Sequence, residues 1–165
     1  MEEVSQCASF LMKALHAGFS EHKDKFALAL PSLDESSPQK KISIFRVFAQ
    51  SMSDHMLLHE FVARSGYMDK HFVASFPKNV PEDFAGPFKA FTRIRIKSRA
   101  AGVQRLKKML EVDTNGNAWI NMQSRENGQR FPMYLESHTA SAGTEGVLNG
   151  YGLSHAANLQ FLPDL

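Results

Sequence analysis

The order of apolar patterns at the start of the chain limits the folds that it can adopt. Between residues 3 and 19, apolar residues recur at the three- to four-residue spacing of a helix that buries one face. Two short apolar runs follow, at 26–30 and 42–49, and the first of them stops at Pro31. This region therefore combines one amphipathic helix, predicted to close near Gly18, with two short strands.

The next stretch extends this order. Ser53 is a candidate N-cap for a second helix that carries apolar residues on one side and ends at Gly66. Residues 71–76 predict a further short strand. Helix, strand, strand, helix, strand is the order of a ferredoxin-like βαββαβ unit whose first strand is missing. We therefore predict an α+β fold with a ferredoxin-like domain at residues 1–80.

A cluster of proline and glycine marks a change of subdomain between residues 77 and 87. Directly after it, basic residues alternate with isoleucines from 93 to 97, which predicts a strand with one cationic face. Residues 100–112 predict a basic amphipathic helix. Paired strands are expected at 118–123 and 131–136, because an Asn-Gly hairpin signal lies between them. We assign residues 88–165 to a second, smaller domain.

The net charge of +2 hides an uneven distribution. Residues 67–112 carry ten Lys and Arg against four Asp and Glu, whereas the segments before and after carry seven against eight and two against five. The basic excess comprises Lys89, Arg93, Arg95, Lys97, Arg99, Arg105, Lys107 and Lys108. A one-sided cluster of this kind is expected of a protein that binds a phosphate backbone. A solvated helix and strand face is the alternative.

Two histidines four residues apart raise the possibility of a metal site. His55 and His59 share one side of the predicted second helix. The metalloprotease pattern needs a Glu directly after the first His, and that position holds Met56. A solvated helix face is therefore the simpler interpretation. The single cysteine, Cys7, cannot form an internal disulfide or a cysteine zinc cage and fits a small buried apolar position.

His16 and Ser124 are candidates for a different chemistry. An RNA strand carries its own nucleophile, the 2′-hydroxyl, and needs only a base with a pKa near neutrality and a group that positions the hydroxyl. A lone histidine and a serine on a tight loop suffice for these roles. The alternatives are an interaction of His16 with the C-terminal helix dipole and ordinary hairpin chemistry for Ser124.

Five short segments, in order, carry a resemblance to a known family. Leu15-His16 precedes an apolar run that ends in Pro-x-Leu-Asp-Glu-Ser at 26–36, and the basic strand spans 92–98. Ser-x-x-x-Gly-Gln-x-Phe occupies 124–131, and Gly-Tyr-Gly-Leu-Ser occupies 150–154. Together they resemble the subtype I-F (Csy-type) CRISPR-associated endoribonuclease that processes precursor CRISPR RNA.

The resemblance implies a ferredoxin-like domain and a smaller domain that grips the stem-loop of the repeat RNA. It places the general base on His16, the hydroxyl-positioning serine on Ser124 and the tyrosine that holds the site together on Tyr151. Cleavage at the 3′ base of the stem would need no metal or other cofactor and would leave a 2′,3′-cyclic phosphate and a 5′-hydroxyl. The enzyme would then stay on the crRNA hairpin and join the protein subunits of the type I-F surveillance complex.

The resemblance also implies contacts with the RNA. Arg93 falls on a base-reading arginine, and Arg95 stands where the family pattern has glutamine; a guanidinium favours guanine, whereas a glutamine amide suits adenine. Phe131 matches an aromatic that stacks on the terminal base pair. The full implied set is Arg93, Arg95, Lys97, Arg99, Arg105, Lys107, Lys108 and Phe131.

Two departures keep a second hypothesis open. The family's first strand has no counterpart ahead of the first helix, and Glu126 replaces the second serine of the loop at 124–131. Both favour a catalytically weak subunit that holds the crRNA hairpin. A metal-dependent enzyme built on His55 and His59 is a third hypothesis. No apolar run approaches the roughly 20 residues of a membrane span, and the acidic start is unlike a signal peptide, so we expect a cytoplasmic protein without a membrane partner.

Overall fold

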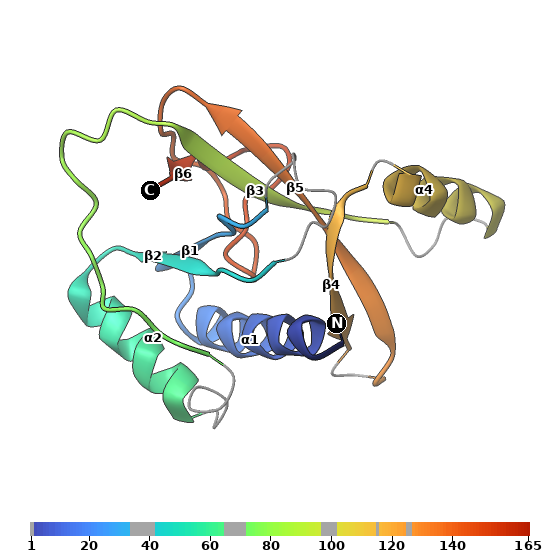
Figure 1. Ribbon diagram of the computed structural model, residues 1–165, viewed down its shortest axis with the longest axis horizontal. Coiled ribbons are helices and arrows are strands. Elements are labelled where there is room, and N and C mark those ends of the chain that lie inside the picture. The colour runs from blue at the N-terminus through green and yellow to red at the C-terminus, as the bar shows by residue number, and fades with distance from the viewer. Residues whose placement is uncertain (1, 34–41, 65–71, 97–101, 115, 125–126) are drawn as a thin grey trace.

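The computed structural model describes residues 2–33, 42–64, 72–96, 102–114, 116–124 and 127–165. Its helices and strands follow one another as α1 (Glu2–Glu21), β1 (Phe26–Ala29), β2 (Arg46–Ala49), α2 (Met52–Arg64), β3 (Phe88–Ile94), α4 (Gly102–Thr114), β4 (Ala118–Gln123), β5 (Arg130–Ala140) and β6 (Leu162–Pro163). The fold is α+β with antiparallel sheets, which confirms the predicted fold class (Figure 1).

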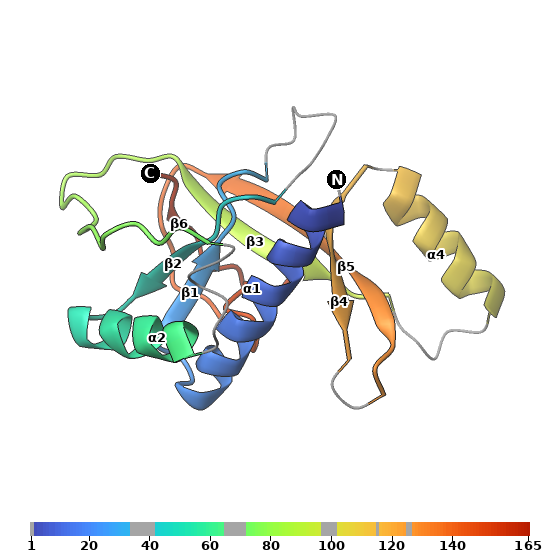
Figure 2. The same ribbon diagram turned by 60° about the horizontal axis from the view of Figure 1, so that its bottom comes forward.

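The first sheet pairs β1 with β2, and Ala27 lies opposite Phe48. Helices α1 and α2 lie on the same side of this sheet (Figures 1 and 2). The two helices approach closely at Gly18, where an added Cβ would stand 2.9 Å from Leu58 Cδ1. This contact explains why Gly18 lies inside α1 rather than at its predicted end: the glycine makes room for α2.

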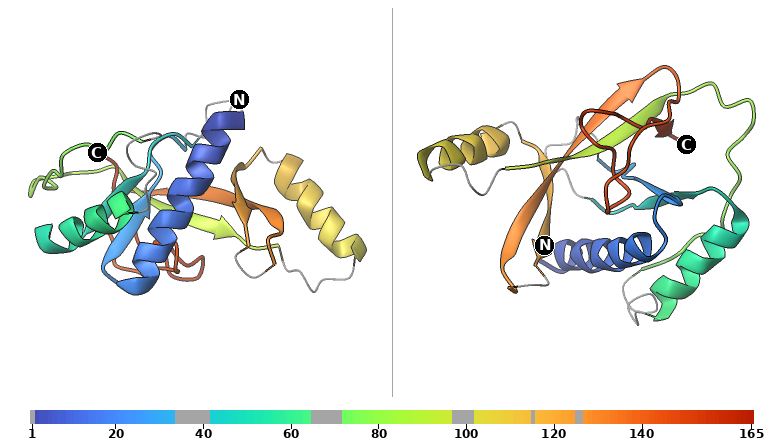
Figure 3. Two further views of the ribbon diagram at one scale, coloured as in Figure 1. Left: turned by 90° about the horizontal axis from the view of Figure 1, so that it is seen from below. Right: turned by 180° about the vertical axis from the view of Figure 1, so that it is seen from behind.

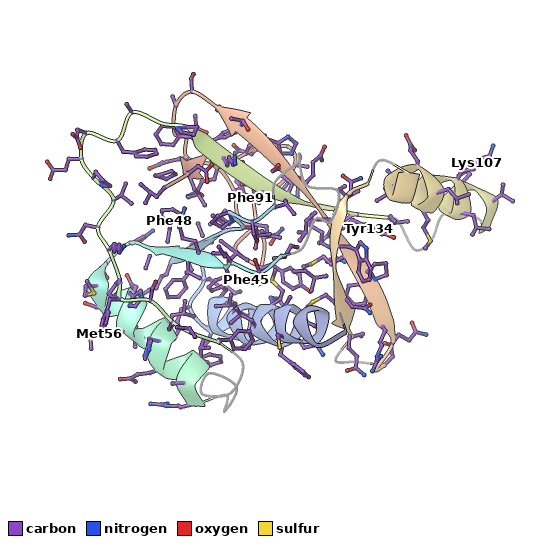
Figure 4. All side chains as sticks on the ribbon, viewed as in Figure 1. Phe45, Phe48, Met56, Phe91, Lys107 and Tyr134 are labelled. Atoms are coloured by element: carbon purple, nitrogen blue, oxygen red, sulfur yellow. The ribbon has the colours of Figure 1, made fainter. Side chains whose placement is uncertain are left out.

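The second sheet has the strand order β4-β5-β3-β6. Residues alternate between buried and exposed along β4, and its buried Ala118, Ile120 and Met122 belong to the same apolar cluster as Met12 of α1. Phe91 of β3 is also in this cluster, and Figure 4 shows its side chain in the interior between the sheets. A single core therefore joins elements from both halves of the chain.

A glycine-containing segment near the C-terminus connects the two sheets. The amide of Leu28 donates to the carbonyl of Gly152 at 2.7 Å, and the amide of Ser154 donates to the carbonyl of Phe91 at 2.8 Å. Gly152 has φ +70°, and a Cβ there would lie 2.7 Å from Phe19 Cε2, so both the backbone and the packing require glycine. These bonds fix the segment Gly152–Ser154, which directly follows Tyr151.

Four predicted elements need correction. Among the described residues of the strand predicted at 93–97, only Arg93 and Ile94 lie in a strand, at the end of β3, and Arg95 and Ile96 follow it without regular structure. The strand predicted at 71–76 is absent from its described part: residues 72–76 are irregular, and Val73 and Phe76 are 100% and 91% exposed. A short apolar run becomes a strand only where a neighbouring strand and a packing surface are available. The strand predicted at 42–49 is confined to β2. The α2 cap is Ser51 rather than Ser53, since the Ser51 Oγ accepts from the Asp54 amide at 3.1 Å.

The predicted basic helix and the β4–β5 hairpin are confirmed. Helix α4 covers almost the whole predicted range and stands away from the sheets, at the end of the molecule opposite α2 (Figure 3). β4 and β5 pair from Ala118 opposite Leu135 to Gln123 opposite Arg130. None of the helices in the described parts of the chain is long and apolar enough to cross a bilayer.

Candidate active site

The candidate site forms where α1 passes the segment at 149–152. The side chain of Asn149 accepts hydrogen bonds from the Tyr151 amide at 2.9 Å and from the Leu153 amide at 3.4 Å. The Gly152 amide donates to the Asn149 carbonyl at 2.9 Å. These bonds fold the segment into a tight turn and hold the backbone of Tyr151 against α1.

His16 lies on α1 directly against this turn. Its Nδ1 hydrogen-bonds with the carbonyl oxygen of Gly150, and its ring stacks on Tyr151 with centroids 4.2 Å apart and planes inclined by 21°. Since a carbonyl oxygen can only accept, Nδ1 must carry the proton. The neutral imidazole therefore keeps its lone pair on Nε2, which is the form that a general base needs.

Arg93 of β3 adds a cation to this group. Its Cζ lies 5.6 Å from the ring centroid of Phe131 and 5.7 Å from that of Tyr151, within the range of cation–π contacts. Its Nε is buried, and no described residue forms a hydrogen bond with it. Burial lowers the pKa of the Arg93 guanidinium from its usual value, the charge of Arg95 lowers it further, and Tyr151 opposes the shift. The group nevertheless stays charged at any physiological pH.

Ser124 lies in the loop that joins β4 and β5. Its amide donates to the carbonyl of Gln129 at 2.8 Å, and its carbonyl accepts from the Gly128 amide at 3.1 Å. Gly128 has φ +67°, which favours glycine at this turn. The neighbouring Gln123 accepts a 3.5 Å hydrogen bond from Lys13, three residues before His16 on α1. Contacts with α1 thus bring the loop toward the histidine, while the described contacts do not join the two side chains directly.

The basic residues divide into several groups. Arg95 is exposed directly after β3, and Lys108 is exposed on α4. Lys107, also on α4, is exposed as well (Figure 4). Lys89 forms an ion pair with Asp164 at 2.8 Å, which partly neutralises it. Three further candidates fall outside the described parts of the chain: Lys97, Arg99 and the side chain of Arg105.

The apolar stripe of α4 differs from the usual amphipathic helix. Val103, Leu106 and Leu110 are 69%, 60% and 60% exposed, because the helix stands away from the sheets instead of packing on them. Val112, near the C-terminal end of α4 and outside that stripe, is buried. Both the basic and the apolar sides of α4 are therefore available to a partner.

The sequence-based interpretation of this site missed two residues. Lys13 lies near the loop of Ser124, and its three-residue spacing from His16 on one helix was a usable signal. Gly150, the first residue of the motif at 150–154, supplies the acceptor that fixes the His16 tautomer, and no local pattern indicates this contact, because the two residues are 134 positions apart.

The two histidines of the metal hypothesis lie on α2, away from this group. The rings of His55 and His59 stack with centroids 6.5 Å apart. No group of three or more His, Cys, Asp or Glu that could hold a metal ion occurs among the residues whose placement is described. These two histidines thus have no third ligand there.

Comparison with known proteins gives a family match that covers most of the chain. A family model described as "CRISPR-associated protein (Cas_Csy4)" matches residues 2–161. The matched range includes α1 with His16, the loop of Ser124 and the turn of Tyr151. No curated protein matches the chain.

Proposed function

Because the chain belongs to the Cas_Csy4 family of CRISPR-associated endoribonucleases, which process precursor CRISPR RNA, we propose that it cuts the repeat at the 3′ base of its stem-loop by internal attack of a 2′-hydroxyl. The reaction uses no metal ion. The protein then stays bound to the crRNA hairpin and joins the protein subunits of a type I-F surveillance complex in the cytoplasm.

The observation that carries this proposal is the hydrogen bond between Nδ1 of His16 and the Gly150 carbonyl oxygen. With the proton of neutral His16 held on Nδ1 by the Gly150 carbonyl, Nε2 is free to accept the proton of the 2′-hydroxyl. The 2′-oxygen then bonds to the adjacent phosphorus while the bond from phosphorus to the 5′-oxygen breaks. The departing 5′-oxygen takes up a proton, which the imidazolium returns through solvent. The products are a 2′,3′-cyclic phosphate and a 5′-hydroxyl, and no water is consumed.

Ser124 and Tyr151 serve this step without exchanging the proton. Tyr151 restrains the imidazole through ring stacking at 4.2 Å, so that Nε2 keeps its direction. Ser124 positions the 2′-hydroxyl by hydrogen bonding from the loop between β4 and β5. Lys13 lies beside that loop and supplies a positive charge near the scissile phosphate.

Binding of the hairpin relies on residues 88–165, which we propose as the RNA-binding domain that packs on a ferredoxin-like domain at 1–80. Phe131 stacks on the terminal base pair of the stem, and Arg95 reads base edges from its exposed position directly after β3. Helix α4 enters the groove of the hairpin with its lysines. The proposed contact set is Arg93, Arg95, Lys97, Arg99, Arg105, Lys107, Lys108 and Phe131.

A gel assay of a labelled repeat hairpin, in excess chelator and with binding scored in parallel, tests this function. Cleavage at the base of the stem that leaves a cyclic phosphate is the expected result. Binding without cleavage would favour the hairpin-holding subunit. Cleavage that the chelator abolishes would instead favour metal-dependent chemistry, and the absence of both binding and cleavage would contradict the proposal.

A further inference from the structure

Four side chains form a continuous series of ring and cation contacts. Arg93 lies against Phe131 at 5.6 Å and against Tyr151 at 5.7 Å, and Tyr151 stacks on His16 at 4.2 Å. The members come from β5, β3, the turn at 149–152 and α1. The series therefore runs from the aromatic expected to meet the end of the stem to the histidine expected to take the proton.

Arg93 occupies this position at an energetic cost. Its Nε is buried and has no hydrogen-bond partner among the residues that the structure describes, and burial lowers the pKa of its guanidinium. A buried unsatisfied donor in a folded protein calls for a functional explanation. The π-faces of Phe131 and Tyr151 offset part of the cost, because a cation is attracted to an aromatic ring most strongly where water is excluded.

The neighbouring arginine stands in a different environment. Arg95 follows β3 two positions after Arg93 and is exposed. An exposed guanidinium can reach an incoming base edge without first leaving another contact. Arg93 would have to give up its contacts with two rings to do the same. The two arginines are thus suited to different tasks.

We propose that Arg93 is a positioning residue, whose guanidinium holds the Tyr151 ring in its stack on His16 and couples that stack to Phe131. This role rests on the proposed function and goes beyond the base-reading role that the family resemblance implies. When the stem stacks on Phe131, a shift of that ring changes the position of the imidazole through Arg93 and Tyr151. Arg93 therefore affects the rate of cleavage more than the affinity for RNA, whereas Arg95 affects affinity and base preference.

The first test uses the free protein and no RNA. The proton on Cε1 of His16 feels the ring current of Tyr151, so its NMR chemical shift reports the stack. We expect Arg93→Ala to move this resonance, and Arg93→Lys, which keeps a cation, to move it less. Arg95→Ala is the matched control. It also removes one positive charge, two positions after Arg93, but the side chain of Arg95 is exposed. If Arg93→Ala moves the resonance no more than Arg95→Ala does, the proposal is overturned.

The second test separates rate from affinity on a labelled repeat hairpin. With the hairpin saturating, Arg93→Ala should slow single-turnover cleavage by roughly 10- to 100-fold, the range that follows from misplacing a catalytic group by about an ångström. Its dissociation constant should rise less than that of Arg95→Ala. A rate equal to that of the unchanged protein would overturn the proposal. If Arg93→Ala fails to fold, Arg93→Lys gives the same comparison with a smaller effect.

The two tests distinguish a failure of the proposed function from a failure of the positioning role. If the unchanged protein binds the hairpin and does not cut it, the proposed function fails, and the resonance of His16 still decides whether Arg93 holds the stack. If cleavage occurs and the resonance is insensitive to Arg93, the positioning role fails and the proposed function stands.

Discussion

The hydrogen bond between His16 and Gly150 determines which nitrogen of the imidazole can act as a base. The partner atom on Gly150 is its carbonyl oxygen, which can only accept, so the Nδ1 of His16 is the donor and Nε2 is left with the lone pair. The turn that presents this carbonyl is itself fixed by Asn149 and by the bond from Leu28 to Gly152. The packing of the C-terminal segment between the two sheets therefore holds His16 in the tautomer that a general base needs.

His16→Ala tests the proposed base. We expect single-turnover cleavage to fall by roughly 10²- to 10⁴-fold, the usual contribution of a general base, while the affinity for the hairpin stays the same. The measurement is the cleavage rate at saturating protein, with the dissociation constant determined separately. The double variant His55→Ala/His59→Ala is the matched control and should cleave normally. Unchanged cleavage by His16→Ala would remove the histidine from the mechanism.

Gly150→Ala tests the close approach of the turn to the imidazole. A Cβ at this position would lie 3.1 Å from Cε1 of His16, so the ring must move by a few tenths of an ångström. We expect cleavage to slow several-fold, up to about 10-fold, since catalysis depends steeply on geometry. Hairpin affinity and melting temperature should change little. A cleavage rate identical to that of the unchanged protein would mean that the contact does not set the position of the ring.

Lys107→Ala/Lys108→Ala tests the role of α4. Both lysines are exposed, and loss of two phosphate contacts should weaken hairpin binding and lower the slope of log K against log salt by roughly 1 to 2. The slope is measured from affinities at several salt concentrations. Lys78→Ala, which removes an exposed lysine before β3, should leave it unchanged. If the double variant keeps the full slope, the hairpin binds elsewhere.

Asp54→Asn tests a structural ion pair that supports α2. The Asp54 carboxylate pairs with Lys25 at 2.6 Å and accepts from Ser51 at 2.7 Å, and these contacts lower its pKa. The folded state then binds a proton less readily than the unfolded state, so this stabilisation is present above about pH 4, the unfolded pKa of Asp. It is lost as the pH falls through the lower folded pKa. Melting curves at several pH values should show Asp54→Asn less stable than the unchanged protein at pH 7 and the difference shrinking below pH 4; a constant difference would contradict this.

Local patterns in the sequence correctly predicted those elements whose formation depends mainly on residues close together in the chain. The basic helix α4 and the hairpin of β4 and β5 are of this kind, since periodicity and a turn signal suffice for them. The strand predicted at 71–76 failed, because pairing and burial of a short apolar run are decided by the rest of the fold. The same reason confines the predicted strand at 42–49 to its last four residues.

His16 and Ser124 could be proposed from the sequence itself, but the grouping of His16 with Tyr151 was predictable only through the family resemblance. His16 and Tyr151 are far apart in the chain, and no spacing rule brings a helix residue onto a turn at the other end. Their contact depends on Gly152, whose missing side chain lets the turn pack on Phe19 and Leu28. The grouping of Arg93 with two aromatic rings was likewise beyond pattern analysis, because one ring comes from β5 and the other from the turn at 149–152, both far from Arg93 in the chain.

Replacement of the attacking 2′-hydroxyl tests the central claim most directly. Two repeat hairpins are compared in excess chelator, identical except for a single 2′-deoxy nucleotide immediately upstream of the scissile phosphate. The account predicts equal affinity for both and cleavage of the all-ribose hairpin alone, with a 2′,3′-cyclic phosphate on the upstream fragment. Cleavage of the 2′-deoxy hairpin at the same bond would contradict internal attack.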